Sequence, residues 1–173
     1  MTSYAILAKL MEYPTDDYFV HLDQCAGGSV DQESCELAHF AEQARALGLL
    51  RLQETYIELF DLRAETSPYI GHHLFGEDIR RSLFMAKLRE HYREAGIADS
   101  TELPDHLSEV LRYVSAVNCN LNGEHAELVE RCVLPAVHHM LRAIESSNSA
   151  YKHLLCAILL ELRQLEKCKV AAG

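Results

Sequence analysis

Apolar side chains recur along most of the chain at intervals of three and four residues, the spacing that places them on one face of a helix. The prolines and most glycines fall between these stripes or at the start of one, and no segment shows the alternation expected of a series of strands. The pattern therefore predicts an all-α fold, an irregular single-domain bundle of about eight or nine helices over residues 1–173. The stripes cover residues 6–11, 19–25, 37–47, 52–60, 79–92, 103–119 and 151–165.

Two glycines and the apolar pattern of residues 77–95 refine the predicted helix boundaries and packing. Gly48 separates residues 37–47 from 52–60 and predicts two helices there. Residues 77–95 predict a long helix capped by Gly96, and their apolar side chains cover more than one stripe. This pattern is typical of a central helix that packs on two sides.

The pattern fails over residues 63–76, RAETSPYIGHHLFG, which have no period and contain three breakers, Pro68, Gly71 and Gly76. These residues predict a loop about 14 residues long that is more mobile than its neighbours. Loops of that length are uncommon in compact domains and are often functional.

The stretch Glu102-Leu103-Pro104-Asp105-His106-Leu107 places a carboxylate beside an imidazole. Pro104 suits the first turn of a helix, and Asp105 would there meet free N–H groups and the positive end of the helix dipole. Because neighbours on a helix point about 100° apart, Asp105 and His106 are poorly placed to form an acid–base pair. A helix start whose histidine is tied to a carbonyl or carboxylate is favoured, and an exposed ligand-binding edge is the main alternative.

The formal net charge of −10 changes this picture by excluding a nucleic-acid partner, which needs a clustered basic face. Between Leu10 and Ala44 there are eight acids and no lysine or arginine. They form either a solvated face or a docking field for a basic segment. The apolar runs are too short for stable membrane insertion and the N-terminus has no export signal, so we expect a cytoplasmic protein.

The ten histidines and six cysteines raise the question of a metal. One Glu-x-x-His pair occurs, Glu36 and His39, but a di-iron bundle needs two. His125, Cys132 and His139 share a spacing of seven that Pro135 interrupts. The cysteines form no CxxC pair and predict free thiols. We therefore expect no metal and no cofactor, with a helical metal- or redox-cofactor protein using His and Cys ligands as the alternative.

Several segments together resemble a known family. They are YIELFDL at 56–62, SPYIGHHLFGED at 67–78, RSLFMAKLREHYREAG at 81–96 and ELPDHL at 102–107. In this order and spacing they resemble the molybdoenzyme assembly chaperones, the TorD/DmsD-like redox-enzyme maturation proteins, and the nitrate reductase delta subunit is the nearest branch.

The resemblance implies a cytoplasmic, non-enzymatic chaperone. Its partner would be the catalytic subunit of a molybdopterin oxidoreductase of anaerobic respiration, bound through that subunit's N-terminal leader, a twin-arginine signal or its remnant. We expect a monomer or weak homodimer. The chain has no tryptophan, so other aromatic residues would supply the ring surface. The implied leader-binding residues are Tyr56, Phe60, Tyr69, Leu74, Phe75, Glu102, Pro104, Asp105, His106 and Leu107.

Overall fold

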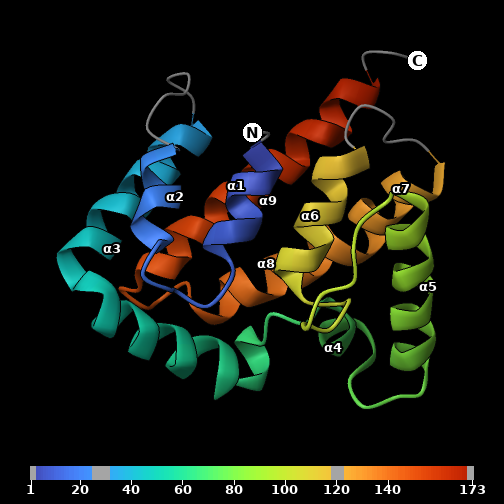
Figure 1. The fold of residues 1–173 in the computed structure, drawn as a ribbon, viewed down its shortest axis with the longest axis horizontal. Coiled ribbons are helices and arrows are strands. Elements are labelled where there is room, and N and C mark those ends of the chain that lie inside the picture. The colour runs from blue at the N-terminus through green and yellow to red at the C-terminus, as the bar shows by residue number, and fades with distance from the viewer. Residues whose placement is uncertain (1–2, 25–31, 118–122, 171–173) are drawn as a thin grey trace.

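The computed structural model describes residues 3–24, 32–117 and 123–170, which form a helical bundle (Figure 1). The predicted all-α class is confirmed, and no named strand occurs in these ranges. The elements are α1 (Ser3–Leu10), α2 (Tyr18–Gln24), α3 (Gln32–Tyr56), the π-helix η1 (Ile57–Asp61), the 3₁₀ turn η2 (Ala64–Thr66), α4 (Ile70–Phe75), α5 (Arg80–Glu94), α6 (Leu107–Val117), α7 (Gly123–Leu128), the π-helix η4 (Val129–Val133), α8 (Leu134–Ala143) and α9 (Ala150–Val170).

Helix α9 supplies the centre of the core. It packs against α3, α8 and α1, while α1 also packs along α6. The predicted apolar stripe of α9 is buried, including Tyr151, Leu154, Leu155, Ile158 and Leu162. Burying such a stripe stabilises a helix far more than its intrinsic propensity does. Among the described residues, none of the helices combines the length and the apolar character needed to span a membrane.

The two helices predicted around Gly48 share the label α3, and a kink at that residue separates them. Gly48 has φ 72° and ψ 167°, a conformation that residues with a Cβ rarely adopt. The predicted break between two helices is therefore confirmed at Gly48, and the second helical stretch begins directly after the glycine. The kink lets α3 bend along the core (Figure 1).

The loop predicted over residues 63–76 is wrong, because most of this segment is helical in η2 and α4. Long-range hydrogen bonds hold it against residues 105–107. The amide of Ile70 donates to the Asp105 carbonyl at 2.7 Å, and the amide of Leu107 donates to the Pro68 carbonyl at 2.8 Å. Between them lies an isolated antiparallel bridge that joins Tyr69 to His106. Such contacts between distant segments leave no periodic signal in the sequence.

Hydrogen exchange tests whether residues 68–70 are joined to residues 105–107 in solution. We expect the amides of Ile70 and Leu107 to exchange slowly, because each donates to a buried carbonyl of a distant segment. The exposed, irregular residues 98–101 should exchange fast and provide the contrast. Equal rates for Ile70, Leu107 and residues 98–101 would show that the two segments are not joined in solution.

Helix α5 does not occupy the predicted central position. It lies at the edge of the bundle (Figure 1), begins at Arg80 rather than Glu77, and buries only Leu88, His91 and Tyr92. Leu83 is 68% exposed. Charged residues on most turns of α5 leave a single narrow face for packing, so its second apolar stripe remains in solvent.

Helix α6 starts later than predicted. Its first residue is Leu107, and Pro104 and Asp105 form a turn ahead of it. The bridge to residues 68–70 takes up the backbone groups of this turn, which explains why the helix does not begin at the proline. The predicted apolar stripe of α6 is confirmed, since Leu107, Val110 and Val114 are buried.

Candidate functional site

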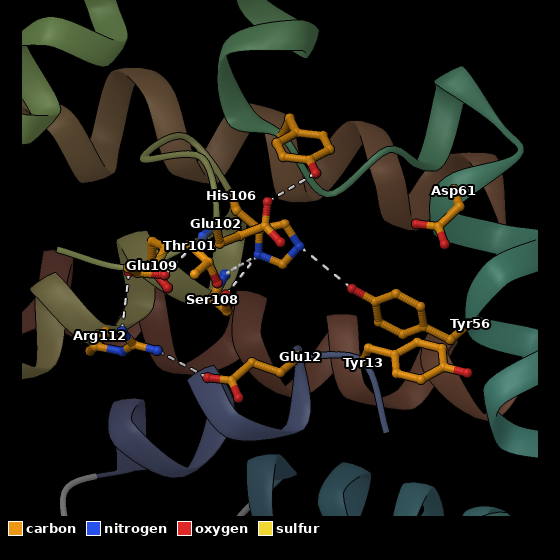
Figure 2. Close-up of a pocket in the computed structure, with 12 residues that line it drawn as sticks. Glu12, Tyr13, Tyr56, Asp61, Thr101, Glu102, His106, Ser108, Glu109 and Arg112 are labelled. Atoms are coloured by element: carbon orange, nitrogen blue, oxygen red, sulfur yellow. Dashed lines mark hydrogen bonds and ion pairs between the residues drawn. The ribbon is translucent and has the colours of Figure 1, made fainter. Parts of the chain in front are cut away.

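A cavity of about 490 Å³ lies beside the paired segments 68–70 and 105–107, where the ends of several helices meet (Figure 2). One wall comes from the ends of α1, α3 and η1, and the other from the turn before α6 and the first turns of that helix. Its volume falls in the range of ordinary ligand pockets, about 300–1,000 Å³. The lining residues are Glu12, Tyr13, Tyr56, Asp61, Tyr69, Ser100, Thr101, Glu102, His106, Ser108, Glu109 and Arg112.

One basic side chain, Arg112, lies in this lining, and two carboxylates engage it. Its Nη2 lies 3.1 Å from Glu12 Oε1, and its Nη1 lies 3.2 Å from Glu109 Oε2. Figure 2 shows Arg112 turned toward both acids. The guanidinium thereby joins α6 to the end of α1 and neutralises the acids on that side of the cavity.

The other two carboxylates of the lining, Asp61 and Glu102, have no basic partner among the described residues. Glu102 Oε1 accepts hydrogen bonds from the Tyr69 hydroxyl at 3.1 Å and from the Leu103 amide at 2.9 Å. Partial burial, together with the charge of Glu102, raises the pKa of Asp61 above its usual range. Burial and Glu102 also raise the pKa of Tyr69 to about 12. The cavity therefore carries unneutralised negative charge that a cation would relieve.

His106 forms part of the wall as a neutral hydrogen-bonding group. Its Nδ1 accepts from the Ser108 amide at 3.2 Å and lies 2.7 Å from Ser108 Oγ, which assigns the ring proton to Nε2. Nε2 faces the Tyr56 hydroxyl at 3.5 Å (Figure 2). Desolvation lowers the pKa of His106, and nearby acids oppose it only partly. The histidine is tethered as predicted, but its partners are Ser108 and the Tyr56 hydroxyl and not the expected carbonyl or carboxylate.

Asp105 is not the exposed helix-start carboxylate that the sequence predicted. It is fully buried, and its Oδ2 accepts a hydrogen bond from Arg81 Nε at 2.9 Å. Its Oδ1 has no partner among the described residues. The Arg81 guanidinium also lies over the Tyr69 ring, 5.5 Å from the centroid. Asp105 thus joins α5 to the turn before α6, and it does not pair with His106.

Gly71 makes the close approach around Asp105 possible. A Cβ built on Gly71 would lie 2.7 Å from Asp105 Oδ2, 3.0 Å from Arg81 Cγ and 3.2 Å from Phe84 Cδ1. Contacts below 3.0 Å do not occur without displacement of a neighbour, so any larger residue would push the carboxylate away from its partner. The glycine that suggested a loop is therefore a packing requirement of α4.

Four of the ten residues predicted for leader binding line this cavity, namely Tyr56, Tyr69, Glu102 and His106. The other six do not, and they divide between the core and neighbouring surfaces. Phe60, Asp105 and Leu107 are buried. Pro104 is buried too, and its carbonyl accepts from the Tyr92 hydroxyl at 2.7 Å. Leu74 and Phe75 are half-buried on α4, where the Phe75 ring lies 5.6 Å from that of Phe84.

Sequence reasoning missed Glu12, Tyr13, Asp61, Glu109 and Arg112. Two of them belong to segments that the sequence had already singled out. Glu12 belongs to the acidic stretch from Leu10 to Ala44, and Asp61 closes the YIELFDL segment. The others needed the packing of α1 on α6, which brings together residues about 100 positions apart.

His125, Cys132 and His139, considered in the sequence as metal ligands, do not form a group in the structure. His125 bonds to the Tyr113 hydroxyl through its Nδ1, and the His139 ring lies 5.2 Å from His73. Cys132 is a free, half-buried thiol. Cys35 and Cys156 are free as well, while Cys25 and Cys119 lie outside the described residues.

Comparison with known proteins gives consistent matches. The family model described as nitrate reductase delta subunit matches residues 27–147, more than half of the chain. The probable nitrate reductase molybdenum cofactor assembly chaperone NarJ of Bacillus subtilis (strain 168) is 26% identical over 170 residues, which cover 94% of this chain and 89% of that protein. The nitrate reductase molybdenum cofactor assembly chaperone NarJ of Escherichia coli (strain K12) is 30% identical over 122 residues, 66% of this chain and 52% of that protein. The match thus spans about half of the Escherichia coli relative.

Proposed function

Because the chain belongs to the nitrate reductase delta subunit family, we propose that it is a molybdenum cofactor assembly chaperone that holds the catalytic subunit of a molybdopterin oxidoreductase by its N-terminal leader. Membership of the family confirms the resemblance noted in the sequence. The relatives carry names of assembly chaperones, not of enzymes, in agreement with the expected non-enzymatic role. Binding of the leader, and a cytoplasmic setting, are parts of the proposal.

One observation carries the proposal: the cavity is lined by carboxylates in excess of its single cation. Asp61 and Glu102 lack a basic partner there, and their mutual repulsion contributes to the raised pKa of Asp61. A leader that is cationic at one end would place a guanidinium or ammonium group between them. The ring of Tyr13, which is 43% exposed, also lines the cavity and offers a surface for a guanidinium.

Exposed apolar side chains adjoin the two carboxylates and suit the rest of a leader. Tyr13 is 43% exposed, and Ile57 and Leu62, which begin and follow η1, are 36% and 73% exposed. A leader could bury its apolar residues on this edge while its cation enters the cavity. Apolar burial contributes roughly 25 cal/mol per Å², reduced by the cost of ordering the peptide. The net charge of −10 further favours encounter with a basic segment.

Calorimetry with a leader peptide from a molybdopterin oxidoreductase tests the proposal. We expect the double variant Asp61→Asn and Glu102→Gln to bind about tenfold more weakly, equivalent to ~1.4 kcal/mol, because the cation loses both carboxylates. Glu145→Gln removes one exposed acid from the turn after α8 and should leave the affinity unchanged. Leu62→Ser should weaken binding without altering the salt dependence, since it removes apolar contact only.

The affinity for a cationic leader should fall as the pH is lowered. Asp61 has a raised pKa, so on acidification it loses its charge earlier than an ordinary aspartate, and the affinity for a cationic leader should fall with it. This fall should be smaller in Asp61→Asn. A scrambled peptide of equal charge provides the specificity control. Equal affinity for the leader and the scrambled peptide would reduce the interaction to charge attraction and would contradict leader recognition.

A further inference from the structure

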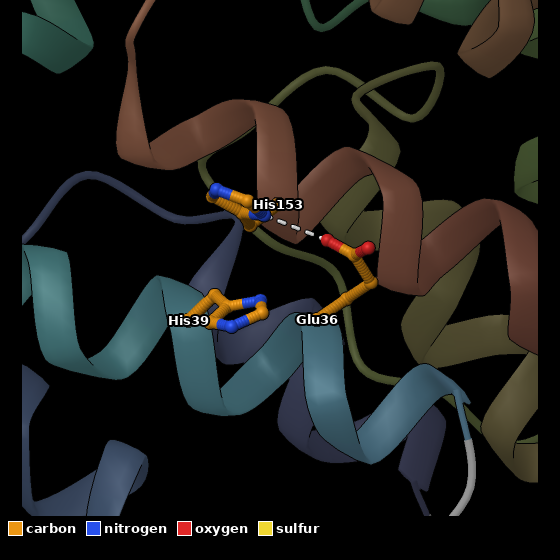
Figure 3. A group of neighbouring side chains, drawn as sticks. All are labelled: Glu36, His39 and His153. Atoms are coloured by element: carbon orange, nitrogen blue, oxygen red, sulfur yellow. Dashed lines mark hydrogen bonds and ion pairs between the residues drawn. The ribbon is translucent and has the colours of Figure 1, made fainter.

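Away from the cavity, two helices bring together three side chains of the types that ligate metals (Figure 3). Glu36 and His39 stand one turn apart on α3, so they share a face of that helix. His153 approaches them from α9, and its Nδ1 lies 2.7 Å from Glu36 Oε2. One ligand atom from each of the three residues lies within 4.8 Å of the other two. The sequence showed only the Glu36–His39 half, because the third residue follows 117 positions after Glu36.

We propose that Glu36, His39 and His153 bind a divalent transition-metal ion of the zinc class. Two imidazoles and one carboxylate form a donor set that such ions use in proteins, with further positions left for water or an external ligand. Around zinc, bonds of about 2.0–2.1 Å place neighbouring ligand atoms roughly 3.4 Å apart. The Glu36–His153 pair is already closer than this, and the exposed His39 closes the remaining gap by side-chain rotation.

The backbone beneath the three residues is well supported. Phe40 follows His39 and Tyr151 precedes His153 by two residues, and both are fully buried with ring centroids 5.6 Å apart. This packing fixes the separation of α3 and α9 directly under the proposed ligands. A site on two rigid helices loses little conformational entropy when it binds an ion.

Partial burial also strengthens the attraction between the Glu36 carboxylate and a bound cation. The side chains of Glu36 and His153 are 22% and 25% exposed, so water screens their charges less than it would on an open surface. At the same time, the exposed His39 leaves an approach from solvent. An ion here would link α3 to α9, and any bound metal would stabilise the folded chain by mass action.

Calorimetric titration of chelator-treated, tag-free protein with Zn²⁺ tests the site. We expect one Zn²⁺ per chain, and affinities at least tenfold weaker in His39→Ala, His153→Ala and Glu36→Gln. His138→Ala is the matched control, because His138 is an exposed histidine on α8 that lies outside the group. It should bind Zn²⁺ as the unmodified chain does.

His39→Ala is the decisive variant, because an exposed side chain can be truncated without unfolding the bundle, which circular dichroism verifies. Zn²⁺ should raise the thermal midpoint of the unmodified protein and of His138→Ala, but not that of His39→Ala. Unchanged affinity in folded His39→Ala, or an equal loss in His138→Ala, would overturn the proposal. These results do not involve a peptide, so they stand or fall separately from leader binding.

Discussion

Replacing Asp105 with alanine is expected to lower the free energy of unfolding by about 3 kcal/mol, because the change leaves the Arg81 guanidinium without its partner and opens a cavity. Asp105 is fully buried and holds Arg81 at 2.9 Å, and the Arg81 side chain is only 20% exposed. A carboxylate at an exposed helix start would contribute about 0.3–1 kcal/mol. Urea denaturation separates the two cases.

Two further variants provide comparisons for the stability of Asp105→Ala. Asp105→Asn keeps the shape and one acceptor oxygen, so it should lose less stability than alanine does. Asp99→Ala removes an exposed acid of the segment before α6 and should change the free energy of unfolding by no more than ~0.5 kcal/mol. If Asp105→Ala were as mild as Asp99→Ala, the buried ion pair would contribute nothing to stability.

Replacing Phe60 with alanine is expected to have a larger effect, a loss of about 3–5 kcal/mol, because a buried aromatic ring is removed from the core. Phe60 is 2% exposed, and its ring centroid lies 4.9 Å from that of Tyr56 and 5.1 Å from that of Tyr151. If the chain binds a leader as proposed, a weaker affinity in this variant would reflect lost core packing, because Phe60 does not line the cavity.

Thermal and urea unfolding of Phe60→Ala, Phe60→Leu and Phe75→Ala provide the comparison. Leucine fills more of the space left by the ring than alanine does, so Phe60→Leu should retain more stability. Phe75→Ala should also cost less, because Phe75 is half-buried at the surface of α4. A loss for Phe60→Ala no greater than that for Phe75→Ala would place Phe60 outside the core.

Helices with one clear apolar stripe could be predicted from the sequence, and those held by distant contacts could not. Helices α6 and α9 bury the residues that their periodicity indicated. Helix α4 has only six residues, too few for a period, and its placement depends on hydrogen bonds to residues 105–107. On α5 the apolar pattern overestimated burial, because periodicity does not show how many sides of a helix find a partner.

The candidate cavity was predictable only in part, for the same reason. Tyr69, Glu102 and His106 come from segments that the sequence singled out. Glu12 and Arg112 meet through the packing of α1 on α6, and no local pattern links them. Asp105 shows the opposite error, since a carboxylate beside a proline has the local appearance of a helix start. Its burial depends on Arg81, 24 positions earlier.

The bridge between Tyr69 and His106 also bears on how fast a leader could be captured. Both residues line the cavity, and the flanking hydrogen bonds of Ile70 and Leu107 hold their backbones together. This wall is complete before any peptide arrives, so association needs no preceding opening of it. The association rate would then depend on electrostatic encounter and on the ordering of the incoming peptide. The lifetime of the complex would depend on how many apolar contacts that peptide makes.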